Sequence, residues 1–206
     1  MGHAGMAAAA VRFLRSAGTG TAPVDALPRP ELRCVREDER APVAPAEFRR
    51  VLGDFATGVT VITAPAAEDD GENGTGATGP AGFACQSFSS LSLDPPLVVF
   101  MVGRTSTTWP RIARAGVFCV NVLSADQAEL CRGFAVSGAD KFGGVAYDAT
   151  PVSGSPRLAG TLAWIDCTIQ AVHTGGDHLI VVGRVNALGS ENPDGSPLLF
   201  HRGRLG

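Results

Sequence analysis

The sequence predicts a mainly β protein, an antiparallel barrel with a few short helices at its edges. Two observations carry this prediction. At least six β-branched or alternating segments follow one another with only turns or short helices between them, whereas a doubly wound parallel sheet would need a regular βαβ alternation. Three short segments have the apolar spacing of a helix, and Pro and Gly clusters mark the turns.

The composition is that of one core-forming domain with an N-terminal extension. The chain has 206 residues, of which 45% are hydrophobic and 18% are charged. We expect residues 1–44, rich in Ala, Pro and Arg, to be disordered, and residues 45–206 to form the domain. The net charge of −3 argues against a nucleic-acid-binding protein. No apolar run approaches about 18 residues, so the sequence predicts no membrane span.

The cysteines indicate a reducing compartment. There are five of them, an odd number, and no CxxC motif occurs. Three lie inside apolar, strand-like runs. We therefore expect buried, reduced thiols and a cytoplasmic protein.

The first elements of the domain are a helix and a strand. Four apolar residues between positions 48 and 55 recur at i, i+3, i+4 and i+7, and Pro45 suits the first helical position. This spacing predicts a helix over 45–56 that ends at Thr57-Gly58. The β-branched segment 59–64 predicts a strand.

A polar loop over 65–81 follows. It contains a formal GxGxxG match at 74–79, but a dinucleotide fingerprint needs a tight strand-to-helix turn inside a βαβ unit. Here about ten loop residues precede the match and no helical pattern follows it. We interpret this loop as a hairpin tip.

The most distinctive stretch is Gly82–Phe100, GFACQSFSSLSLDPPLVVF. Its first part places four serines and a glutamine within seven residues, followed by the turn Asp94-Pro95-Pro96. Small polar groups on a strand suit an anionic planar cofactor, although composition alone equally fits a serine-rich surface strand. The segment 97–102 is apolar on both faces, which predicts burial in a barrel wall or against a second subunit.

The middle of the domain alternates short helices with strands. Ser106 or Thr108 can cap a helix that carries Trp109 and Ile112, and 117–123 reads as a buried strand. Ser124 and Gln127 form a capping-box pattern that predicts a helix reaching Phe134.

The C-terminal third predicts a long hairpin. Segments 162–172 and 179–188 alternate as strands, with Asp166 expected on the face opposite the apolar residues. The pair Gly175-Gly176 predicts the turn between them. A last short strand is expected over 197–200.

Two kinds of chemistry are disfavoured. His173, Asp177 and His178 match no zinc spacing, so we expect no metal site. No GxSxG occurs, which argues against a hydrolase with a nucleophile elbow. Polar groups that bind and orient a cofactor remain the best interpretation.

Six motifs together resemble the flavin reductase family with the FMN-binding split barrel, over about 48–203. Their order and spacing carry the resemblance, because each motif alone is weak. They are FATGVTVIT (Phe55–Thr63), GFACQSFSSLSLDPPLVVF (Gly82–Phe100), FCVNVL (Phe118–Leu123), DKFGGV (Asp140–Val145), GGDHLIVVGRV (Gly175–Val185) and LLFHRG (Leu198–Gly203).

The resemblance implies a role for each matching residue. The isoalloxazine and ribityl chain would lie along Ala84, Cys85, Gln86 and Ser87, and Thr57 and Thr60 would flank the ring. The flavin phosphate would be reached by Ser89, Ser90 and Ser106. Phe142 would close over the flavin, and His178 would contact the nicotinamide as the candidate catalytic residue.

The resemblance also implies an activity. It is hydride transfer from NADH or NADPH to FMN or FAD by a homodimer, which supplies reduced flavin to a separate monooxygenase. Two alternatives stay open: a split-barrel enzyme whose tightly bound flavin reduces another acceptor, and a non-catalytic flavin carrier or sensor. The choice of flavin and of nicotinamide also stays open.

Overall fold

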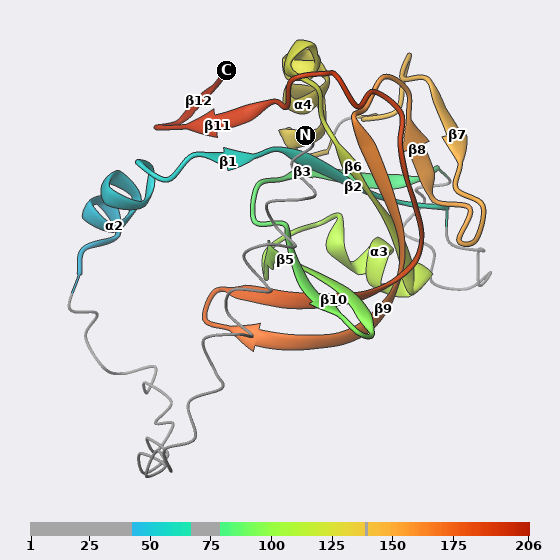
Figure 1. Ribbon diagram of the computed structural model, residues 1–206. Coiled ribbons are helices and arrows are strands. Elements are labelled where there is room, and N and C mark those ends of the chain that lie inside the picture. Colours follow the sequence, from blue (N-terminus) through green and yellow to red (C-terminus); the bar gives the residue numbers. More distant parts are fainter. Residues whose placement is uncertain (1–42, 67–78, 139) are drawn as a thin grey trace, which may run out of the picture. The chain divides into compact units, whose positions relative to one another are not determined.

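The computed structural model describes residues 43–66, 79–138 and 140–206 (Figure 1). Within them the chain is mainly β, and its largest sheet has seven antiparallel strands in the order β3-β2-β6-β9-β10-β5-β4. The strands are β2 Thr60–Ala64, β3 Ala81–Cys85, β4 Ser89–Leu93, β5 Pro96–Gly103, β6 Val117–Val122, β9 Ala163–Gly175 and β10 His178–Ser190.

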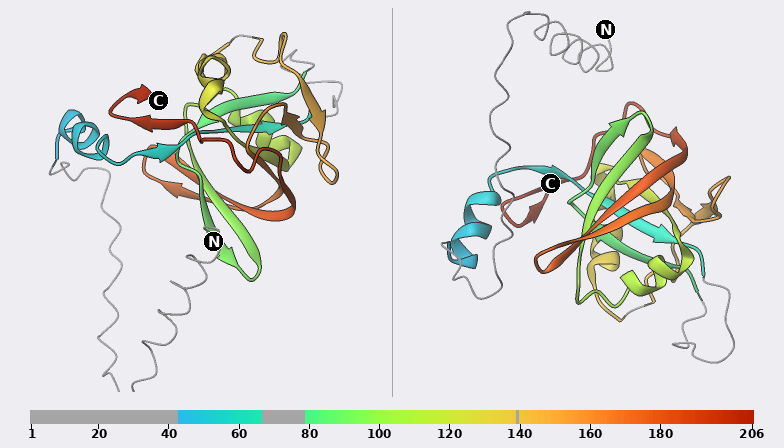
Figure 2. Two further views of the ribbon diagram at one scale, coloured as in Figure 1. Left: turned by 45° about the horizontal axis from the view of Figure 1, so that its top comes forward. Right: turned by 90° about the horizontal axis from the view of Figure 1, so that it is seen from below.

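This sheet closes on itself because its two edge strands are neighbours in the chain. β3 and β4 form opposite edges, yet only Gln86, Ser87 and Phe88 separate them. The chain from Cys85 to Ser89 spans at most about 14 Å, whereas a flat sheet of seven strands is about 29 Å wide. The sheet therefore has to curl, and Figure 2 shows it wrapped into a barrel.

An aromatic cluster fills the barrel. Phe100 of β5 contacts Trp109 and Phe118 edge to face, with ring centroids 6.2 and 5.2 Å apart. It also meets Phe83 of β3 at 6.0 Å, across the point where the barrel closes. Trp109 and Ile112 are the buried residues of helix α3 (Trp109–Ala115), which therefore packs against this cluster.

A second apolar cluster lies where the 3₁₀ turn η1 (Ala125–Gln127) and helix α4 (Ala128–Ala135) pack against β3. Phe134 of α4 sits directly over Gly82: a Cβ atom at Gly82 would come within 2.7 Å of its ring. Position 82 therefore needs glycine for this packing. Leu123, Leu158 and Leu198 complete the centre of the cluster.

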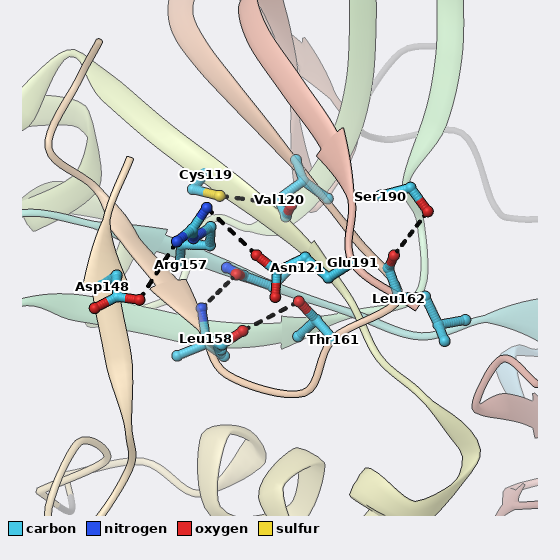
Figure 3. Close-up of polar contacts among 10 residues, drawn as sticks. All are labelled: Cys119, Val120, Asn121, Asp148, Arg157, Leu158, Thr161, Leu162, Ser190 and Glu191. Carbon is cyan, nitrogen blue, oxygen red and sulfur yellow. Dashed lines mark hydrogen bonds and ion pairs between the residues drawn. The ribbon is translucent and has the colours of Figure 1, made fainter. Parts of the chain in front are cut away.

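One buried amide fastens the small hairpin of β7 (Tyr147–Ala149) and β8 (Pro156–Leu158) to the barrel (Figure 3). Asn121 of β6 accepts a 2.8 Å hydrogen bond from the Leu158 N–H through Oδ1. Its Nδ2 donates to the carbonyls of Val61 and Pro156. Outside the core, Arg157 lies 3.3 Å from both Asp148 and Glu191.

The remaining elements flank the barrel. Helix α2 (Pro45–Leu52) precedes β1 (Thr57–Gly58), which pairs with β11 (Leu199–His201). β11 in turn pairs with β12 (Arg204–Leu205). α2 buries none of its residues against the rest of the described chain.

The helix ends earlier than its apolar spacing predicts. It stops at Leu52, and Thr57-Gly58 do not cap it: they form β1. The N–H groups of Asp54 and Phe55 bond to the carbonyls of Val51 and Leu52, three residues back, so the chain continues as tight turns. Phe55, seven residues after Phe48, fits either a continued helix or such turns. The apolar spacing alone therefore predicts a helix that is too long.

Asp166 lies on the face of β9 opposite Ile165 and Cys167, as the alternation predicts, but a loop of the same chain covers it there. It is fully buried, and its Oδ2 accepts hydrogen bonds of 3.1 and 3.0 Å from the N–H groups of Val152 and Ser153. Strand alternation separates the two faces of β9, but it contains no information on the loop that buries this carboxylate.

The strand over 97–102 is buried on one face within this chain. Val98, Phe100 and Val102 are buried, whereas Met101 is 40% exposed and Leu97 and Val99 are partly exposed. The barrel wall explains the inner face only.

Several local predictions are confirmed. Ser106 Oγ accepts a hydrogen bond from the Trp109 N–H at the start of α3, and the Gln127 side chain accepts one from the Ser124 N–H in a capping box. The turn Gly176-Asp177 joins β9 to β10, with Gly176 at φ 66°.

Among the described residues, no helix combines the length and apolar character needed to cross a membrane.

Candidate functional site

An open groove of about 1770 Å³ runs between α2, the start of β2, the β3–β4 junction and the β9–β10 turn. It brings together six of the predicted site residues, which come from three separate parts of the sequence. These six are Thr57, Thr60, Gln86, Ser87, Ser89 and His178.

One wall of the groove is the junction that closes the barrel. Ser87 Oγ accepts a hydrogen bond from the Met101 N–H and donates one to the Met101 carbonyl, both at 2.9 Å. It thereby extends the β4–β5 ladder, in which Ser89 already pairs with Val99, by one more position. The Ser87 hydroxyl is thus engaged in holding the junction to β5.

The two neighbours of Ser87 are more available to a ligand. Gln86 is exposed, and its amide makes no hydrogen bond with any described residue. Ser89 is also exposed, and its hydroxyl donates to the Ser90 carbonyl at 3.1 Å, which leaves its oxygen able to accept. Both present small polar groups to the groove.

The two threonines of the groove differ in their bonding. Thr60 Oγ1 donates to the Cys85 carbonyl at 2.8 Å and fixes β2 against the end of β3. Thr57 Oγ1 is buried and has no hydrogen-bond partner among the described residues. A buried hydroxyl without a partner is unfavourable, so Thr57 fits a site in which a bound ligand completes its hydrogen bonding.

The opposite wall carries a hydrogen-bonded histidine–aspartate pair at the β9–β10 turn. His178 Nδ1 lies 2.7 Å from Asp177 Oδ1. The hydrogen bond from His178 is the main cause that lowers the pKa of the Asp177 carboxyl below its usual value; the charges of His178 and Arg49 add to it. This contact holds the imidazole through Nδ1 and leaves Nε2 for a ligand.

The groove also contains three arginines. Arg50 is bonded to Glu47 at 2.7 and 2.9 Å, and Arg202 Nε donates to Asp54 at 2.6 Å. The Arg202 N–H also donates to the Gly53 carbonyl, which ties the end of α2 to the β11–β12 turn. The side chain of Arg49 has no ion pair within the described part of the chain.

Five predicted residues lie outside the lining of this groove. Ala84 and Cys85 are in β3, where burial raises the pKa of the Cys85 thiol. Ser90 is in β4, and Ser106 uses its hydroxyl to cap α3. Their assignment to the flavin remains a prediction.

Phe142 is the fifth of these residues. Its ring packs edge to face between Phe134 and Tyr147, with centroids 5.1 and 5.4 Å apart. Nearby, Lys141 Nζ donates to the carbonyls of Gly82 and Phe134 at 3.1 Å and fastens this segment to β3. Closure of Phe142 over a flavin remains a prediction.

Sequence reasoning missed the contribution of α2 and of the C-terminal turn. Arg49, Phe48 and Arg202 line the groove although they lie far from the serine-rich stretch in sequence. Their helix and turn patterns were visible, but no local signal indicates that these two segments face the β3–β4 junction.

No group of three His, Cys, Asp or Glu side chains suited to a metal ion occurs in the described residues.

Comparison with known proteins identifies the family. The chain is 49% identical over 162 residues to the reductase subunit HsaB of a flavin-dependent monooxygenase from Rhodococcus jostii, covering 79% of this chain and 77% of that protein. Two solved structures superpose with a TM-score of 0.69.

The first of these structures is nitrilotriacetate monooxygenase component B from Mycobacterium thermoresistibile, 44% identical, with 78% of this chain and 84% of that one covered. The second is the NADH:FAD oxidoreductase SgcE6 of Streptomyces globisporus in complex with NAD and FAD fragments, 37% identical, with 78% and 90% covered. The pattern of the "Flavin reductase like domain" matches residues 52–206. The chain therefore belongs to the flavin reductase family.

Proposed function

We propose that this protein is an NAD(P)H:flavin oxidoreductase that reduces FMN or FAD and supplies the reduced flavin to a separate monooxygenase. One observation carries the proposal: a single open groove joins a wall of small polar groups at the β3–β4 junction to the Asp177–His178 pair. The named activities of the relatives, which include an NADH:FAD oxidoreductase, support the same conclusion.

The residues of the groove fit a flavin. The unpartnered Thr57 hydroxyl and the exposed Gln86 amide and Ser89 hydroxyl are the hydrogen-bonding groups that the polar edge and side chain of a flavin need. When bound, the flavin supplies the ring that accepts the hydride. Thr57 and Gln86 would hold that ring, and Ser89 would bind toward its phosphate.

His178 would position the nicotinamide. Asp177 holds the imidazole at Nδ1, so Nε2 accepts a hydrogen bond from a carboxamide when the ring is neutral and donates one when it is protonated. Hydride transfer depends mainly on placing two rings in contact, and no protein nucleophile is needed. We therefore expect His178→Ala to raise KM for the nicotinamide more than KM for the flavin; equal increases would contradict this role.

Release of reduced flavin agrees with the shape of the site. The groove is open, and its free polar groups are single hydroxyls and an amide without a bidentate arginine clamp on the junction wall. Such a site favours moderate affinity. A partner monooxygenase that receives the flavin is accordingly part of the proposal.

We further propose that the protein is a homodimer. Helix α2 exposes an unpartnered apolar face, on which Phe48 is 56% and Leu52 is 55% exposed, with Phe55 at 76% beyond it. A second apolar surface lies on the outside of the barrel, where Met101 pairs with Ile180 and Val99 with Val182. Apolar surface of this kind usually marks an interface, and a second copy is the occupant that a family of small reductases supports.

A cytoplasmic location completes the proposal. The four cysteines among the described residues, Cys85, Cys119, Cys131 and Cys167, are all free and buried, as is usual where thiols stay reduced.

The decisive experiment crosses FMN and FAD with NADH and NADPH in a steady-state assay of the purified protein. Nicotinamide oxidation that depends on added flavin is the expected result, and no oxidation at saturating flavin would contradict the proposal. A flavin that survives dialysis would instead indicate an enzyme with a resident flavin and another acceptor. Size-exclusion chromatography with light scattering tests the dimer, and a monomer at all concentrations would contradict it.

A further inference from the structure

Among the described residues, the charges that line the groove leave one arginine without an ion pair. The lining contains Arg49, Arg50 and Arg202 as permanent cations and Asp54 and Asp177 as acids. Arg50 is held by Glu47 and Arg202 by Asp54, while Asp177 is engaged with His178. Within the described residues, Arg49 remains without an ion pair.

The position of Arg49 places it on the nicotinamide side of the groove. On helix α2 it follows Phe48 directly, so it lies about 100° around the helix from that apolar residue, at the flank of the apolar face. Its charge also reaches the Asp177 carboxyl of the β9–β10 turn, where it contributes to the lowered pKa of that group. Arg49 and the Asp177–His178 pair line the same groove from two different elements, and α2 and the β9–β10 turn lie on the same side of the barrel (Figures 1 and 2).

The nicotinamide dinucleotides, which we propose bind in this part of the groove, carry negative charge close to the nicotinamide ring. NADH and NADPH have a pyrophosphate between the nicotinamide riboside and the adenosine. A guanidinium binds such groups well, because its planar fork of N–H donors matches two oxygens at once. The junction wall offers hydroxyls and an amide to the flavin but no comparable cation.

We propose that Arg49 binds the pyrophosphate of the nicotinamide dinucleotide while His178 contacts its nicotinamide. This assignment rests on the proposed reductase activity and adds a binding residue from α2. It also gives the helix a role in the site of its own chain.

The experiment compares three variants with the wild-type protein loaded with flavin. Arg49→Ala removes the guanidinium, and Arg49→Lys keeps a charge but loses the fork. Arg132→Ala is the matched control, because it removes one positive charge from an exposed helical residue that pairs with Glu129 and lies outside the lining of the groove. Binding of ADP-ribose, measured by calorimetry, reports the pyrophosphate contact without any turnover.

We expect Arg49→Ala to weaken ADP-ribose binding and to raise KM for NADH about tenfold, equivalent to about 1.4 kcal/mol. Arg49→Lys should have an intermediate effect, and Arg132→Ala should change either quantity less than twofold. KM for flavin should stay within twofold in all three variants. The loss should shrink at high ionic strength, since the contact is partly exposed.

Two results would overturn the proposal. One is an effect of Arg49→Ala no larger than that of Arg132→Ala. The other is an increase in KM for flavin as large as that for NADH, which would assign Arg49 to the flavin phosphate. If Arg49→Ala melts below the assay temperature, Arg49→Gln takes its place. A wild-type protein that binds ADP-ribose through Arg49 yet oxidises no nicotinamide would keep this subsite and refute the reductase activity.

Discussion

Replacement of Ser87 by alanine separates a structural role of this serine from a role in flavin binding. In the structure its hydroxyl makes two 2.9 Å hydrogen bonds to the backbone of Met101 and joins the β3–β4 junction to β5. The resemblance to flavin reductases alone assigns the same hydroxyl to the flavin. Only the first role requires Ser87→Ala to destabilise the protein in the absence of flavin.

The size of the effect follows from these two bonds. A typical intramolecular hydrogen bond contributes about 0.5–1.5 kcal/mol net. Met101 is 40% exposed, so water can partly replace the lost partner, and we expect a loss of about 1–2 kcal/mol in total. In a domain of this size each kcal/mol lowers Tm by about 2–4 °C, which gives a decrease of about 2–8 °C.

The assay is thermal unfolding of the flavin-free protein, followed by flavin titration at a temperature where both proteins are folded. We expect Ser87→Ala to lower Tm without flavin and to weaken flavin binding as well, because Gln86 and Ser89 flank the loosened position. Ser87→Thr, which keeps the hydroxyl, should restore most of both. Unchanged stability without flavin, together with weaker flavin binding, would refute the structural role and favour direct contact.

Three further predictions concern other buried polar groups. Asn121→Leu should cost about 2–4 kcal/mol in chemical denaturation, because it leaves the Leu158 N–H and other buried groups unpaired; a loss below 1 kcal/mol would contradict this. Thr57→Val should raise KM for flavin severalfold with little loss of stability, since the hydroxyl has no hydrogen-bond partner among the described residues; an unchanged KM would exclude it from the site. Burial raises the pKa of the Cys119 thiol to about 12 from 9.0. The folded state thus favours the neutral thiol, so its contribution to stability is complete below pH 9 and decreases as the pH rises toward 12. In a Cys34→Ser background, thiol reagents at pH 8 should react only on unfolding; rapid labelling of the native protein would contradict it.

The sequence predicts the fold well because its strands and turns follow from short-range sequence patterns. The GGDH turn, the capping box at Ser124 and the Pro-Pro turn each depend on a few adjacent residues. The closure of the barrel follows from the short β3–β4 junction once the strand order is known, but strand order is a property of the whole chain. The burial of Asp166 could not be predicted for the same reason: the loop that supplies its two N–H donors lies more than ten residues away in sequence.

The candidate site was predicted only in part because hydroxyl groups serve several purposes. The resemblance assigns Ser87, Ser89 and Ser90 of one short stretch, together with Ser106, to the cofactor. In the structure Ser87 holds the barrel closed and Ser89 lines the groove, while Ser106, farther along the chain, caps a helix. The side-chain chemistry is the same in each case, so only the neighbours in space distinguish the roles. Arg49 and Arg202 were missed because their position in the groove depends on where α2 and the C-terminal turn pack.

Met101 connects the two main proposals physically. Its backbone holds Ser87 and thus the flavin wall, while its side chain lies with Ile180 on the apolar outer surface proposed for the second copy. If a second copy covers that surface, water is excluded from the Met101–Ser87 hydrogen bonds. Breaking one of these bonds then costs more free energy, because water cannot replace the lost partner. Dimer formation would then stabilise the junction that carries Gln86 and Ser89. Flavin affinity should accordingly rise with protein concentration across the range where the dimer forms, and a charge at position 101 should weaken both together.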